Sequence, residues 1–70
     1  MAVRTHHPAV IRIDSEHYGV VVSCHRTSGA ALTALDRAKR RLPADAIPYL
    51  VYRVVVVPCG TVVGERVRYA

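Results

Sequence analysis

Hydrophobic and polar residues alternate along two neighbouring stretches near the start of the chain, residues 9–13 and 17–24. Between them, residues 14–16 (Asp-Ser-Glu) have the side chains that favour turns. Alternation on both sides of a short connection predicts an antiparallel β-hairpin. One face of this hairpin is expected to present Ile11, Ile13, Tyr18, Val20, Val22 and Cys24.

The pattern then changes to helical spacing. Residues 29–42 place their apolar side chains three and four positions apart, which predicts an amphipathic helix. Thr27 or Ser28 precedes it and can accept a hydrogen bond from a free amide of the first turn. Pro43 is expected to end it. The apolar stripe consists of Ala31, Leu35, Ala38 and Leu42.

Tyr49–Val57 is the most apolar stretch of the chain, with Arg53 as its single charge. β-Branched and aromatic residues occupy both of its faces, which predicts a strand at the centre of the sheet. Residues 58–60 (Pro-Cys-Gly) have turn chemistry, and residues 61–69 are expected to return as a fourth strand. The face of the central strand turned toward the helix is expected to carry Leu50, Tyr52, Val54 and Val56.

These elements predict an α+β fold, a single ββαββ domain over residues 8–70, with residues 1–7 as a flexible tail. One helix is expected to cover one face of a four-stranded, mainly antiparallel sheet. Two strand orders satisfy the handedness rule for crossovers, an antiparallel 2-1-3-4 sheet and a mixed 2-1-4-3 sheet. The two apolar faces of the third strand favour the first order.

Length and charge add constraints on stability and partners. A chain of 70 residues buries a small core, so a disulfide, a metal or oligomerisation is often needed. The net charge of +5 favours polyanions or acidic protein surfaces as partners. No apolar run is long enough to cross a bilayer, so we expect a cytoplasmic protein without a membrane partner. Cys24 and Cys59 are then expected to stay reduced.

The sheet face opposite the helix is the predicted partner surface. A single helix leaves that face uncovered, and its side chains form a valine patch with basic margins. We expect a homodimer, packed sheet against sheet through this face or joined by extending the sheet through an edge, or a protein partner with an acidic surface. The residues of this predicted surface are Val51, Arg53, Val55, Val57, Arg66 and Arg68.

The alternative hypothesis is nucleic-acid binding without sequence preference. The last turns of the predicted helix contain Arg37, Lys39, Arg40 and Arg41, which can neutralise phosphates. The same four cations also complement the negative end of the helix dipole, which is a purely structural explanation.

No pattern in the chain predicts catalysis or a bound cofactor. A glycine-rich phosphate loop, a paired carboxylate motif and a nucleophile elbow are all missing, so we do not expect an enzyme. His17, Cys24, His25 and Cys59 are metal-ligand types, but they lack Cys-x-x-Cys or His-x-x-x-His spacing. We therefore expect no metal and no cofactor.

The stretches Pro8–Ile11 and Tyr18–Val20, followed by the predicted helix, faintly resemble a HicB-type antitoxin domain. That domain resembles a partial ribonuclease-H fold with a third strand and a Pro-Gly-Cys loop before its helix. Residues 24–27 leave no room for either, so the chain is not assigned to the family. The resemblance implies a small inhibitor that occupies an acidic surface of another protein. A phage or mobile-element accessory protein that blocks a host factor would suit this chain length.

The sequence analysis therefore predicts a small, basic, non-enzymatic protein-binding module.

Overall fold

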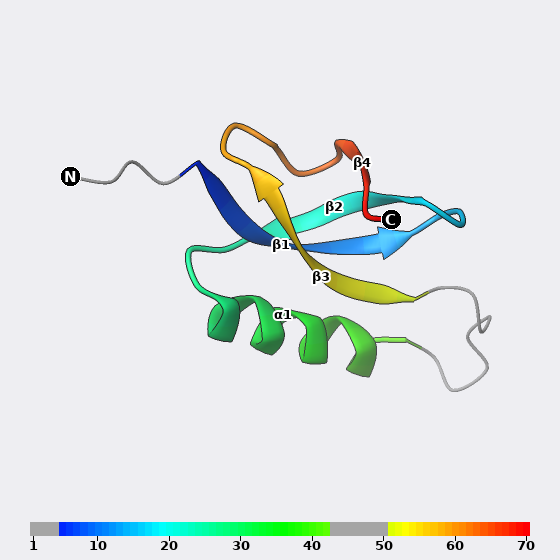
Figure 1. Ribbon diagram of the computed structural model, residues 1–70. Coiled ribbons are helices and arrows are strands. Elements are labelled where there is room, and N and C mark those ends of the chain that lie inside the picture. The colour runs from blue at the N-terminus through cyan, green and yellow to red at the C-terminus, as the bar shows by residue number, and fades with distance from the viewer. Residues whose placement is uncertain (1–4, 43–50) are drawn as a thin grey trace.

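The computed structural model describes residues 5–42 and 51–70 (Figure 1). Within these ranges the chain forms four antiparallel strands in a curled sheet and one helix. The α+β class and the ββαββ order predicted from the sequence are confirmed. The elements are β1 (His6–Ile13), β2 (Tyr18–Cys24), α1 (Ser28–Arg40), β3 (Tyr52–Pro58) and β4 (Arg66–Arg68).

The strand order is β3-β1-β2-β4, so both predicted orders are wrong. The fourth strand pairs with β2, with Tyr18 opposite Arg68, and does not form a hairpin with β3. The chain between β3 and β4 crosses to the far side of the sheet, where the amide of Gly64 donates to the carbonyl of Val21 at 2.8 Å. Gly64 has a φ of 94°, a conformation that favours glycine. As a result β3 lies at an edge and not at the centre.

The centre of the sheet is β1, which pairs with β2 on one side and β3 on the other. Ala9, Val10 and Ile11 are all fully buried. The strand begins at His6, inside the segment expected to be a flexible tail. A hydrogen bond of 2.9 Å from the amide of Cys59 to the carbonyl of Thr5 extends its ladder with β3. Residues 1–4 of the predicted tail lie outside the described ranges.

The faces of the first hairpin also differ from the prediction. The register places Val21 opposite Ile11 and Gly19 opposite Ile13, so Gly19 and Val21 share their face. The prediction for Tyr18, Val20 and Val22 is wrong because it assumed a different turn length. An irregularity between Val10 and Ile11 then shifts the register, and this places Cys24 opposite Ala9 as expected.

The main core lies on the face of β3 that the sequence analysis left open. The expectation that Ile11 and Ile13 share the face covered by the helix is wrong, because both belong to this core region. The curl brings the two edge strands together there, so that Val55 and Val57 of β3 and Val67 of β4 belong to the same hydrophobic cluster. Val57 is only 3% exposed. The expectation that these two valines lack an intrachain partner is therefore wrong, because the curl covers the face. The cluster consists of Ala9, Ile11, Val21 and Val57, with Ile13, Val55, Val67 and Tyr69 against it.

Helix α1 packs on the opposite face, chiefly over β1 and β3 (Figure 1). Its cap is Thr27, whose hydroxyl accepts a hydrogen bond of 3.1 Å from the amide of Ala30. Ala31 is its buried residue, and Arg40 is its last, two positions before the predicted end. The predicted stop at Pro43 and the predicted strand residues before position 51 lie outside the described ranges. Val56, expected beneath the helix, is 69% exposed.

Gly19 permits the close approach of β2 to β1, and substituting it tests this packing. A Cβ there would lie 2.8 Å from Cδ1 of Ile11 and 2.9 Å from the carbonyl oxygen of Arg12. We expect Gly19→Ala to lower the free energy of unfolding by about 1–3 kcal/mol, measured by urea denaturation.

The matched control for this substitution is Gly29→Ala in α1, where a Cβ would meet no atom within 4 Å. It should be neutral or stabilising by up to about 1 kcal/mol, since alanine favours the helix. Equal effects of the two substitutions would contradict the described contact.

Candidate functional site

A groove separates one side of α1 from the sheet and is the candidate site. Its volume is about 620 Å³, within the range of ligand-binding clefts. Helix α1 and its C-cap Arg41 form one wall, and β1, β2, β3 and His25, which follows β2, contribute the rest. The described lining residues are Val10, Val22, Ser23, His25, Ala30, Thr33, Ala34, Arg37, Ala38, Arg41 and Tyr52.

Helix geometry divides the basic cluster predicted in the last turns of the helix. Arg37 and Arg41 are four residues apart, so they lie on the same side of the helix and both line the groove. Lys39 and Arg40 are not among its lining residues. The Nε atom of Arg40 instead forms an ion pair of 3.1 Å with Oδ2 of Asp36. The four predicted cations therefore do not form one surface.

The charged side chains that line the groove are all positive. None of its described lining residues is acidic, and neither guanidinium group of Arg37 and Arg41 has a carboxylate partner within residues 5–42 and 51–70. On the sheet side, Nε2 of His25 lies 2.8 Å from the hydroxyl oxygen of Ser23. Each guanidinium can donate several hydrogen bonds in one plane, a geometry that matches phosphate and carboxylate oxygens.

The groove also offers apolar and aromatic surface. Val22 contributes an exposed aliphatic side chain beside the buried Val10, and the half-buried Tyr52 of β3 contributes an aromatic ring. An aromatic ring beside cations is a combination that binds the face of a nucleobase while the cations contact its phosphates. Ser23 and His25 are in hydrogen-bond contact, and no carboxylate is among the described lining residues to orient the imidazole.

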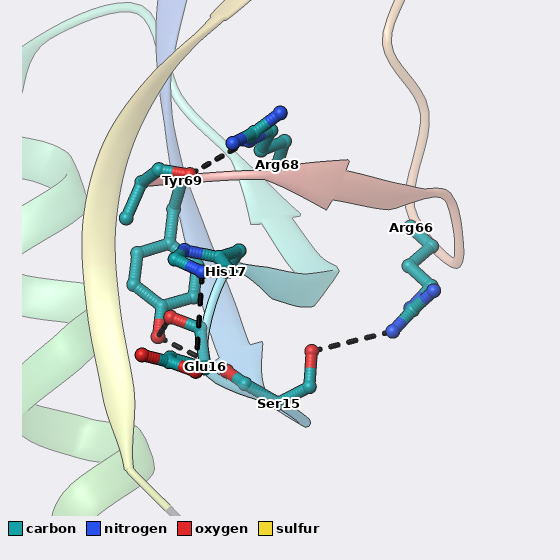
Figure 2. Close-up of polar contacts among 7 residues, drawn as sticks. Ser15, Glu16, His17, Arg66, Arg68 and Tyr69 are labelled. Carbon is teal, nitrogen blue, oxygen red and sulfur yellow. Dashed lines mark hydrogen bonds and ion pairs between the residues drawn. The ribbon is translucent and has the colours of Figure 1, made fainter.

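At the other end of the sheet, polar contacts attach β4 to the β1–β2 turn (Figure 2). The hydroxyl of Tyr69 donates to the carbonyl oxygens of Ser15 at 3.0 Å and Glu16 at 2.7 Å. Arg66 donates from Nε to Oδ2 of Asp14 at 3.0 Å and from a terminal nitrogen to Oδ1 at 3.4 Å. These contacts hold the short strand β4 in place.

The arginines of the predicted partner surface are engaged within the chain. Arg53 lies over the ring of Tyr69 at 5.4 Å, and Arg66 lies over that of Tyr18 at 4.5 Å. Arg68 donates from Nε to the carbonyl oxygen of Ala70 at 2.7 Å. Of the predicted valines, Val51 is 43% exposed, whereas Val55 and Val57 belong to the core region. A binding role for this set stays a prediction; Arg53, Arg66 and Arg68 are exposed, whereas the curl of the sheet buries Val57 and partly buries Val55.

The residues considered as metal ligands are dispersed. Cys24 donates its Sγ–H to the carbonyl oxygen of Thr61 at 3.6 Å, and Nε2 of His17 lies 3.9 Å from Oε2 of Glu16. Cys24 and Cys59 are not joined by a disulfide. Across the described part of the chain, no three His, Cys, Asp or Glu residues are grouped in a way that could hold a metal ion.

Comparisons with known proteins give no indication of function. No protein-family model matches the sequence, and neither the curated proteins nor the solved structures gave a significant match. In the described ranges, the chain has no helix with the length and apolar character needed to cross a membrane.

The contact between Arg66 and Asp14 predicts a pH effect. The hydrogen bond from Arg66 holds the pKa of the Asp14 carboxyl below its ordinary value. The stabilisation linked to this depressed pKa is complete above about pH 4 and is lost as the pH falls through the folded-state pKa. In an NMR titration, Arg66→Gln should return the pKa of Asp14 toward its ordinary value.

Arg68→Gln is the control for this titration, because it removes the same charge from the same strand but no contact with Asp14. It should leave the pKa of Asp14 low. An identical Asp14 pKa in the wild type and in Arg66→Gln would contradict the assigned cause.

Proposed function

We propose that this protein binds single-stranded nucleic acid, without sequence preference, in the groove between α1 and the sheet. The observation that carries the proposal is the position of Arg37 and Arg41. Both line a groove that has no acidic residue among its described lining, and neither guanidinium has a carboxylate partner in the described ranges. The net charge of +5 supports it, because a basic chain attracts polyanions at long range.

The recessed position of the two arginines favours a single strand over a duplex. Duplex readers commonly insert a projecting helix face into a groove of the DNA. Here the solvent-facing side of α1 carries the ion pair between Asp36 and Arg40, with a carboxylate that repels phosphate. A flexible strand can enter the groove and place one base against Tyr52. Stacking on a ring tolerates any base, which accounts for the absence of sequence preference.

The proposal predicts that the groove arginines matter more than their neighbours. Anisotropy of a labelled oligothymidine of about 15 nucleotides would measure binding, a length suited to a small domain. We expect the double variant Arg37→Gln/Arg41→Gln to weaken binding at least tenfold. It should also reduce the slope of log affinity against log salt by roughly 1.4, because two phosphate contacts are lost.

Lys39→Gln/Arg40→Gln is the matched control, since it removes the same charge from the same helical turns outside the groove. It should weaken binding less than about threefold, through the long-range field alone. Equal losses in both double variants would contradict the groove as the site. Equal or tighter binding of a duplex would contradict the choice of a single strand, and no binding at low salt would overturn the function.

A further inference from the structure

The two edges of the sheet are protected to different degrees. Strand β4 forms one edge, is three residues long and carries Arg66 and Arg68. Strand β3 forms the other, is seven residues long and carries Arg53 as its only charge. Its register with β1 is continuous from His6 to Arg12. Proteins usually protect such edges with charges, bulges or short strands, because an open edge pairs with other strands. Only β4 shows that protection.

The register fixes which backbone groups of β3 face outward. The amide of Ile13 donates to the carbonyl of Val51 at 2.8 Å, and that of Cys59 donates to Thr5 at 2.9 Å. In an antiparallel pair such bonds recur at every second residue, so the odd-numbered residues of β3 bond to β1. The N–H and C=O groups of Tyr52, Val54 and Val56 then point away from the sheet. No other described strand pairs with them.

Apolar side chains accompany these groups. Val56 is 69% exposed on β3, and Leu32 is 57% exposed on α1. Leu32 lies about half a helical turn around the axis from Arg37 and Arg41, so it is on the margin of α1 opposite the groove. Because the groove borders β2 and α1 packs chiefly over β1 and β3, we infer that this margin is the one nearer to the outer edge of β3. A partner strand added there would cover both side chains.

We propose that β3 pairs along this edge with β3 of a second copy of the chain, antiparallel, to form a dimer with one continuous sheet. The register places Val54 opposite Val54 of the second copy and Tyr52 opposite Val56. All three outward N–H groups and all three matching C=O groups are then bonded. Pro58, which has no N–H, lies beyond the paired segment. Arg53 comes opposite Val55 of the second copy, so no like charges oppose each other directly.

The second copy fits this edge for two reasons. The segment is self-complementary, because its three free residues are symmetric about Val54 and a twofold axis satisfies them all. A chain of 70 residues also buries a small core, which association would enlarge. The inference does not depend on nucleic-acid binding, since it uses backbone groups of β3, whereas the groove takes from β3 the side chain of Tyr52.

Sedimentation equilibrium of the purified chain tests the dimer, with Val56→Lys as the disrupting variant. A lysine at this exposed position places charge on the edge, and we expect it to convert a two-chain mass into a one-chain mass. Val63→Lys is the matched control, because Val63 is similarly exposed at 62% but lies outside the strands. It should remain dimeric, and circular dichroism should show that both variants are folded.

Cysteine crosslinking tests the register in a background of Cys24→Ser and Cys59→Ser. In the proposed pairing the two Cα atoms of residue 54 lie about 5.5 Å apart, within the range of a disulfide. Val54→Cys should therefore form a covalent dimer on mild oxidation. Val56→Cys should not, because its two copies are four residues out of register, roughly 13 Å apart along the strands.

A one-chain mass for the wild type at 100 micromolar would overturn the dimer. A two-chain mass that survives Val56→Lys would overturn the edge as its interface. Crosslinking through residue 56 in place of residue 54 would overturn the register. Absence of nucleic-acid binding by the wild type at low salt, with the dimer intact, would overturn the proposed function and leave this inference standing, so the two proposals fail separately.

Discussion

The rest of the fold depends on β1, because this strand is hydrogen-bonded along both edges and covered on both faces. Its odd-numbered side chains, Ala9 and Ile11, face the core of the curled sheet, while Val10 faces α1. All three are fully buried, and no other strand in the described ranges has a comparable run. Strand β2 can approach closely because Gly19 has no side chain. Helix α1 and the edge strand β3 pack or pair directly on β1, and β4 is attached to the turn that joins β1 to β2.

The elements themselves were predictable from local chemistry, but their order was not. Thr27 caps α1 as its hydroxyl predicts, and alternation located the first hairpin and β3. Hydrophobicity suggested a central position for β3, yet valine also suits an edge, and Val56 is largely exposed there. Strand order depends on long-range pairing between β2 and β4, for which three residues of β4 give no signal. The faces of β2 depended on the turn length, which alternation does not determine.

The candidate site was also predictable only where it depends on local sequence. Helical spacing is local, so the side shared by Arg37 and Arg41 follows from the sequence, as does the separate position of Arg40 beside Asp36. The part contributed by the sheet, including Ser23 and Tyr52, required the strand order. The contacts of Arg53 with Tyr69 and of Arg66 with Tyr18 join residues far apart in the chain, so local sequence patterns could not show them.

The central claim is that β3 is an edge strand. The amides of its odd-numbered residues bond to β1, and those of its even-numbered residues face outward. Residue-resolved amide hydrogen exchange, measured by NMR over a range of protein concentrations, tests it most directly. We expect Arg53, Val55 and Val57 to be protected at every concentration, because their amides bond to β1. The amides of Val54 and Val56 should exchange rapidly in dilute solution and become protected as the dimer forms. Uniform protection of β3 at the lowest concentration would place it inside the sheet and contradict the account.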